Sequence, residues 1–365
     1  MAVLRAHKWI ALALVALALA VAAGCSTVGY YLQAVNGQAE ISRKARPIPE
    51  LVQDPAIEPQ LRAKLEQVAQ IRDFASRELA LPDNGSYRRY ADLKRPFVVW
   101  NVFAAPEFSL QPKQWCFPFA GCVAYKGYFK KEDAERLGAQ LREQHYDVFV
   151  GGVPAYSTLG WLDDPVLNTV IRYPDPEIAR LIFHELAHQV VYVQGDSTFN
   201  ESFAVTVEEE GVKRWLAAYG TPAQHLQFEC ADRSTSAFDA LVERYRKRLE
   251  TLYAQPLDAD SMRREKQQTF DDMRAEYRRI RLDWRCITGY DRWFEQSLNN
   301  AQLASVAIYS ELVPSFQRLL EQKNGDLPRF YAEVKRLAAL PKQQRDLALA
   351  ADNAHRTGAN AAADP

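Results

Sequence analysis

The segment "RLIFHELAHQVVYV", residues 180–193, sets two histidines in an apolar frame. His184 and His188 lie one helical turn apart, so in a helix both imidazoles point to the same side. Asp175 and Gly195 are a suitable start and stop for that helix. The remaining faces of this helix are almost entirely apolar, which predicts a buried helix rather than a surface helix. These residues are Leu181, Ile182, Phe183, Leu186, Ala187, Val190 and Val191.

The pattern H-E-x-x-H suits a catalytic metal site. Two imidazoles on adjacent turns of a rigid helix can hold one zinc ion. Glu185 follows His184, and from there it can reach a water molecule beside the metal without being a ligand. The same pattern also occurs by chance around histidines that are satisfied core residues. A buried pair of imidazoles needs polar partners, however, and a metal ion supplies them.

A catalytic zinc ion takes a third protein ligand, which must lie further along the chain. Val191 and Gln194 stand where metzincins carry a glycine and a third histidine, so that ligand set is excluded. Two glutamates remain. Nineteen residues separate His188 from Glu208, a spacing that thermolysin-like enzymes use, and twelve separate it from Glu201. Spacing alone would select Glu208.

Local context selects Glu201 instead. We expect the first helix to continue for about one and a half turns beyond His188 before the chain reverses. Thr198 or Asn200 can cap the next helix, which places Glu201 in its first turn, facing the histidines. Glu208 would lie two turns further on. It could orient a ligand histidine, or it could be solvated beside other glutamates.

The first residues, 1–24, form a predicted lipoprotein signal peptide. After a basic start, Trp9–Ala23 is an apolar run shorter than the ~20 residues of a membrane-spanning helix, as in secretory signals. It ends in "AAGCS", which resembles the lipobox of bacterial lipoproteins. This resemblance implies a lipid on Cys25 and, from Ser26, a location on the periplasmic face of the outer membrane. The alternative is a plain secreted protein that is cut nearby.

The remaining chain has the composition of a globular protein. Of 365 residues, 48% are apolar and 25% charged, and the formal net charge of −1 gives no general attraction to nucleic acid. We expect a tether and lead-in over 25–56, a zinc peptidase domain over 57–349 and a disordered tail over 350–365. Within the domain, a mixed α/β lobe (57–170) precedes a helical lobe (171–349).

Residue patterns underlie this division. Apolar residues recur at helical spacing in the first part of the mixed lobe, and Val- and aromatic-rich strands follow. From about Asp175 to Leu349 nearly everything has a helical period. The predicted fold is therefore α+β and predominantly helical, with the two-histidine helix at a cleft between the lobes. The predicted elements of the mixed lobe are helices over 58–81 and 130–146 and strands over 95–105, 121–129 and 147–153.

Four cysteines remain after Cys25, an even number in an oxidising compartment. Cys116 and Cys122 flank a Pro- and Gly-containing stretch that can bring them together, and Cys230 and Cys286 would then pair by elimination. Three connectivities are possible and this is the favoured one. A zinc site made of the four is disfavoured because no C-x-x-C spacing occurs.

Several segments together resemble the predicted aminopeptidase family of bacterial lipoproteins, whose metal-binding core is similar to that of zinc gluzincin peptidases. The resemblance spans most of the mature chain. It is carried by "HELAHQ" (184–189), "GDSTFNESFA" (195–204), "EEEG" (208–211), "YSTLGWLDDPVLN" (156–168) and "NNAQLASVAIY" (299–309). Gluzincins present their third ligand as Asn-Glu near the start of a second helix, and the chain has that pair at 200–201.

The resemblance implies a zinc peptidase acting on peptides or proteins, with His184, His188 and Glu201 as ligands and Glu185 as general base. The Gly-x-Met-Glu-Asn segment with which gluzincin aminopeptidases grip a free amine is absent. Two alternatives stay open: a lipid-anchored binding or scaffolding protein with a structural or vestigial zinc site, and a cell-wall endopeptidase or amidase. A structural site needs ligands only, so Glu185 favours an enzyme.

Three smaller expectations complete the site. Tyr290 and Tyr309 lie in the downstream segments, where either could donate to an oxyanion. The strand over 121–129 could bind an extended peptide by its edge, but an interior strand is the favoured interpretation. Asp163 and Asp164 could line the cleft, and a turn is favoured.

Overall fold

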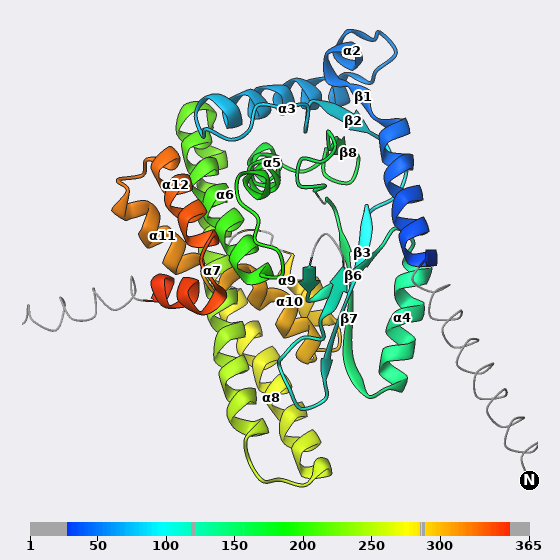
Figure 1. The fold of residues 1–365 in the computed structure, drawn as a ribbon, viewed down its shortest axis with the longest axis vertical. Helices are drawn as coiled ribbons and strands as arrows, with labels where there is room; N and C mark the ends of the chain where they lie inside the picture. Colours follow the sequence, from blue (N-terminus) through cyan, green and yellow to red (C-terminus); the bar gives the residue numbers. More distant parts are fainter. Residues whose placement is uncertain (1–27, 118–120, 156, 285, 287–288, 351–365) are drawn as a thin grey trace, which may run out of the picture.

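The computed structural model describes residues 28–117, 121–155, 157–284, 286 and 289–350. The mixed part is built on a three-stranded antiparallel sheet in the order β6-β3-β7, with α4 connecting β6 to β7 (Figure 1). The bounds are β3 Val99–Pro106, β6 Tyr125–Tyr128, α4 Lys131–Glu143 and β7 Tyr146–Val153.

The central strand β3 is buried on both faces because a helix covers each face. Trp100, Val102 and Ala104 pack with residues of α4. Phe103 and Ala105 point to the other face and pack with residues of α10 (Asn300–Ser310). Successive side chains of a strand alternate between faces, which explains why β3 is apolar at every position except Asn101. Through α10 the sheet is attached to α6 (Ser197–Tyr219), which packs against the two-histidine helix α5 (Asp175–Val190).

Two smaller sheets complete the strands. One has the order β1-β2-β8, with β1 and β2 antiparallel and β2 and β8 parallel. The other is the hairpin β4-β5, in which Cys116 and Cys122 face each other and form a disulfide. Their bounds are β1 Arg46–Pro47, β2 Arg89–Ala91, β4 Trp115–Phe117, β5 Gly121–Val123 and β8 Val166–Leu167.

The largest core lies among helices from both ends of the chain. Phe203 packs on Phe316 and Phe330, so α6, α11 and α12 share one aromatic cluster. Residues of α3 and α5 belong to the same core, which therefore spans both predicted lobes. Its helices are α2 Ile48–Gln53, α3 Pro59–Arg77, α5 Asp175–Val190, α6 Ser197–Tyr219, α11 Val313–Gln322 and α12 Leu327–Ala338.

A second core holds a long helical hairpin that extends away from the rest of the fold (Figure 1). Tyr277 stacks on Phe294, with ring centroids 3.8 Å apart, and thereby joins α8 to α9. A disulfide between Cys230 and Cys286 ties α7 to the segment before α9. Both favoured cysteine pairings are thus confirmed. The helices are α7 Pro222–Tyr253, α8 Ala259–Ile280, a 3-10 turn at Arg281–Asp283, and α9 Tyr290–Glu295.

The α+β, predominantly helical fold is confirmed, with differences at several elements. The single strand expected over 121–129 is divided into β5 and β6, and β6 pairs with β3 alone within the described residues, so it is an edge strand and not an interior one. Residues 28–44, expected to belong to a tether, are helical. No helix in the described part of the chain is both long and apolar enough to span a membrane.

Candidate metal centre

The two-histidine helix α5 is buried as predicted. Ile182, Phe183, Leu186 and Ala187 have no exposed surface. The helix ends at Val190, about one turn earlier than expected from the glycine stop. The next residue has extended backbone angles, so the chain turns towards α6 directly after the second histidine.

The turn between α5 and α6 is held by a side chain of α6. The Asn200 side chain accepts a hydrogen bond from Val193 N at 2.7 Å and donates one to Val193 O at 2.8 Å. Gly195 adopts φ +81°, a conformation that side-chain-bearing residues rarely take. The cap of α6 is Asp196, which accepts from Phe199 N, so the expectation of a cap at residue 198 or 200 was wrong. The Asn200 side chain instead closes the turn by its two hydrogen bonds to Val193.

Asp196 is also half of a buried ion pair. Its Oδ2 lies 2.5 Å from Arg345 Nη2, and both side chains are at most 5% exposed. Arg345 lies in the helical segment 342–350, the last residues that the structure describes. Removing one charge of such a pair leaves the other buried without compensation.

We therefore expect Asp196→Asn to destabilise the protein by about 3 kcal/mol, because the amide can still cap α6 but leaves Arg345 unpaired. Chemical denaturation of the purified variant measures this change. Asp326→Asn is the matched control, since Asp326 caps α12 at an exposed position. An equal, small loss of stability in both variants would mean that the ion pair contributes nothing beyond the cap.

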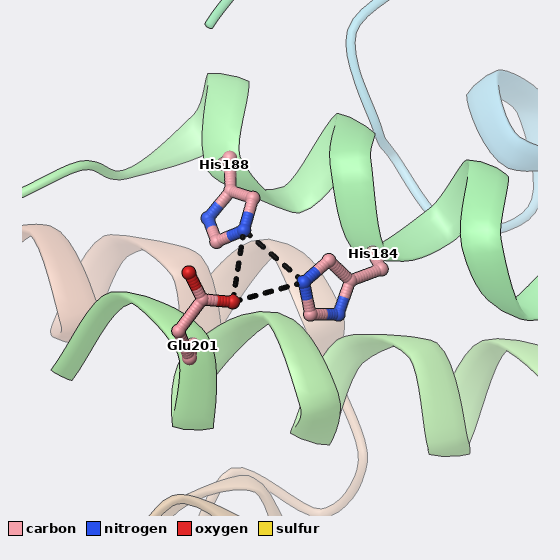
Figure 2. Close-up of side chains that lie close together, drawn as sticks. All are labelled: His184, His188 and Glu201. Carbon is pink, nitrogen blue, oxygen red and sulfur yellow. Dashed lines mark hydrogen bonds and ion pairs between the residues drawn. The ribbon is translucent and has the colours of Figure 1, made fainter. Parts of the chain in front are cut away.

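Three donor atoms from α5 and α6 face one another (Figure 2). Glu201 Oε2 lies 3.2 Å from His184 Nε2 and 3.5 Å from His188 Nε2, and the two ring nitrogens are 3.2 Å apart. Glu201 is in the second turn of α6, not the first, because α6 begins at Ser197. These three residues form a group that could hold a metal ion.

The mutual distances match those of a tetrahedral site. Zinc bonds to imidazole nitrogen and carboxylate oxygen at roughly 2.1 Å, which sets tetrahedral ligand atoms roughly 3.4 Å apart. The three observed distances lie between 3.2 and 3.5 Å. Two imidazole nitrogens and one carboxylate oxygen are also a typical donor set of catalytic zinc. The residues present therefore fit a zinc ion.

Glu208 lies behind His184 and not beside the three donors. Its Oε2 accepts a hydrogen bond from His184 Nδ1 at 2.7 Å, and Arg180 Nη1 lies 3.4 Å from its Oε1. A proton on Nδ1 leaves Nε2 of the same ring free to face a metal ion. The sequence left two roles open for Glu208, orienting a ligand histidine or lying solvated beside other glutamates. The structure supports the first, because Glu208 accepts the hydrogen bond from His184.

The electrostatics of the two other glutamates differ. Burial alone would raise the pKa of Glu201, but the imidazoles of His188 and His184 lower it to about 2, so Glu201 is ionised as a ligand must be. Burial raises the pKa of Glu185, although both imidazoles oppose this effect. A carboxylate with a raised pKa is suited to accept a proton and to return it.

Tyrosines surround the group. Tyr309 on α10 lies with its ring centroid 6.4 Å from that of His184, and Tyr192 lies 6.4 Å from His188. Burial and the negative charge of Glu201 together raise the pKa of Tyr125 on β6. By contrast, the Tyr290 hydroxyl is 2.9 Å from Thr235 Oγ1, and its ring stacks in the second core.

The segment with Asp163 and Asp164 forms a turn, which was the interpretation favoured from the sequence. Asp164 Oδ2 accepts from Thr158 N at 2.7 Å and from the Thr158 hydroxyl at 3.0 Å, which closes a turn. Burial raises the pKa of Asp164 to about 6, against these hydrogen bonds. A large open groove lies elsewhere, lined by parts of α3, β2 and residues 168–175, and none of the three metal donors lines it.

Comparison with known proteins adds an independent observation. A family model described as "Putative aminopeptidase" matches residues 29–349. The chain belongs to this aminopeptidase family. No curated protein and no solved structure gives a significant match. Membership indicates a peptidase with peptides as substrates, and it covers the mixed part and the helical part together.

Two tyrosines near the three donors were not singled out in the sequence. Tyr125 is expected only as part of a strand, and in the structure burial and the charge of Glu201 raise its pKa. Tyr192 follows His188 at a spacing of four residues, which was the available signal. The predicted lipid site, Cys25, lies outside the described residues.

Proposed function

We propose that the protein is a zinc-dependent metallopeptidase, acting as an aminopeptidase, and that His184, His188 and Glu201 hold the ion. The supporting observation is the tetrahedral spacing of their three donor atoms, with Glu185 on the same helix. The match of the chain to an aminopeptidase family supports the substrate class.

The chain's own residues divide the reaction among them. When bound, a zinc ion lowers the pKa of a water molecule and polarises a carbonyl group. Glu185 takes a proton from the attacking water and returns it to the leaving amine. Glu208 keeps the His184 ring in one tautomer and orientation. To Tyr309, whose ring centroid lies 6.4 Å from that of His184, we assign the donation of a hydrogen bond to the carbonyl oxygen as negative charge develops there.

Metal analysis tests the proposal directly. We expect the purified protein to contain about one zinc ion per chain, because the site offers three donors and leaves one position open. A chelator should abolish cleavage of a peptide library, and added zinc should restore it. The same library reports whether cleavage starts at free N-termini. Full cleavage by metal-free protein would contradict the proposal.

Replacement of Tyr309 tests the oxyanion donor. The charge of Glu201 and burial raise the pKa of Tyr309, so its hydroxyl stays protonated and can donate. We expect Tyr309→Phe to lower kcat by about 10²-fold while zinc content is kept. Tyr290→Phe, whose hydroxyl contacts Thr235, is the matched control and should retain activity. An unchanged kcat in Tyr309→Phe would remove this residue from the mechanism.

We further propose that the mature chain is anchored by a lipid on Cys25 at the periplasmic face of the outer membrane. The apolar run that ends in "AAGCS" supports this, as does Ser26 directly after the cysteine. Anchoring places the peptidase where it meets peptides of the cell envelope. Mass spectrometry of the mature N-terminus tests the modification.

A further inference from the structure

An exposed apolar stripe runs along the first helix that the structure describes, residues 28–44. Its members are exposed to 57%, 37%, 56% and 64%, whereas the buried residues of the same helix face the protein. They repeat at intervals of three and four residues and so occupy one side of the helix. We call this set the outer stripe: Val28, Tyr31, Leu32 and Val35.

The opposite side of the helix is fixed to the protein. Tyr30 stacks on Phe117 and meets Tyr128 edge-on, both at 5.5 Å between centroids, and Lys126 Nζ lies 4.3 Å from its ring centroid. The Gln33 side chain accepts a hydrogen bond from Phe129 N at 3.0 Å. The helix is therefore joined to β4 and to the end of β6, and these contacts give its outer stripe one fixed direction relative to the body.

Close approach to the sheet also depends on one glycine. A side chain at Gly37 would overlap the ring of Phe129. Gly37 thus lets the helix backbone lie against an aromatic ring of the mixed part. A flexible tether would have no need of such a contact.

We propose that the outer stripe lies on the surface of a lipid bilayer and sets the orientation of the whole protein on it. This rests on the proposed lipid at Cys25. Only Ser26 and Thr27 separate that cysteine from Val28, and three residues span at most about 11 Å even when fully extended. An interfacial helix enters the headgroup and acyl boundary by about 5–10 Å, so the stripe is within reach of it.

Charge and area favour a bilayer over a second copy of the chain. No charged residue occurs between Ser26 and Ala39, so contact with lipid requires no desolvation of a charge along the stripe. Four side chains expose roughly a few hundred Å², whereas a stable dimer buries about 1,200–2,000 Å² in total. A lipid already inserted nearby makes a small apolar contact sufficient.

Docking of the stripe would also fix the height of the metal centre. The helix packs on β6, β6 pairs with β3, and β3 packs on α10, which contacts α6, the helix of Glu201. The distance between bilayer and site is then set by packed elements and not by a loose linker. The consequence is a peptidase held in one orientation over the membrane.

A single fluorescent probe tests this proposal. The four cysteines after Cys25 form two disulfides, so Val35→Cys gives the lipidated protein one free thiol for an environment-sensitive dye. In proteoliposomes of phosphatidylethanolamine and phosphatidylglycerol, we expect its emission to shift to shorter wavelength and to be quenched by a bilayer-embedded spin label. Leu226→Cys on α7, which is 68% exposed, is the matched control and should stay in water.

Two outcomes overturn the docking. One is a Val35 probe that stays in water although mass spectrometry shows the lipid on Cys25. The other is shielding that occurs without vesicles and grows with protein concentration, which would indicate self-association. An unmodified Cys25 refutes the anchor by itself; docking is then judged on the Cys25→Ser, Val35→Cys chain, which keeps one free thiol, titrated with these vesicles, where an unshifted Val35 probe overturns it.

Discussion

Glu185→Gln is expected to abolish hydrolysis while the protein keeps its metal. The amide has nearly the shape of the carboxylate but cannot accept the proton of the attacking water, and loss of a general base lowers kcat by about 10²- to 10⁴-fold. Glu185 is not among the three donors, so the metal content should not change. Peptide cleavage and metal analysis on the same preparation measure both effects.

Glu177→Gln is the matched control, because Glu177 lies on the same helix at an exposed position and pairs with Arg180. It should retain both metal and activity. Full activity in Glu185→Gln would refute the proposed role of Glu185. A wild-type protein that holds zinc but cleaves no peptide would instead favour the lipid-anchored binding protein.

The fold class could be predicted because its signals are local. Apolar residues at helical spacing identified α3, α4 and the helices after Asp175, and the Val- and aromatic-rich runs identified β3 and β7. The position of β6 at the sheet edge could not be read in this way, because its neighbours come from distant segments. Nor could the helix of residues 28–44, whose inner face is defined by contacts with distant residues such as Phe117 and Phe129.

The structure brings together the three residues expected as ligands, His184, His188 and Glu201, but the reasons for their arrangement were not visible in the sequence. Gly195 suggests a later stop of α5, whereas Val191 already has extended backbone angles and Asn200 makes two hydrogen bonds to Val193, so the helix ends earlier. α5 ends earlier than expected and α6 also starts earlier, and the two differences offset each other. Glu201 therefore faces the histidines from the second turn of α6. Side-chain to backbone hydrogen bonds of this kind compete with helix signals and are not visible in periodicity.

Replacing Glu201 and Glu208 by alanine, one at a time, is expected to show which of them is the metal ligand and which supports a ligand. Glu201→Ala removes a donor whose oxygen lies 3.2 and 3.5 Å from the two imidazole nitrogens, so the purified variant should contain no zinc and show no activity. Glu208→Ala removes only the acceptor of His184 Nδ1, and loss of such a partner weakens metal binding by about 10- to 100-fold. It should therefore retain zinc at saturating concentration and some activity.

Zinc titration of the apo-proteins measures both affinities, and Glu210→Ala, which removes a partly buried partner of Arg214 on the same helix, is the matched control. If Glu208→Ala loses the metal and Glu201→Ala retains it, the ligand assignment is wrong. That outcome would require α6 to shift by about two turns relative to α5, and Asn200 would have to release both of its hydrogen bonds to Val193. The contact that closes the turn is thus also the physical reason why Glu201, and not the glutamate at the more familiar spacing, faces the two histidines.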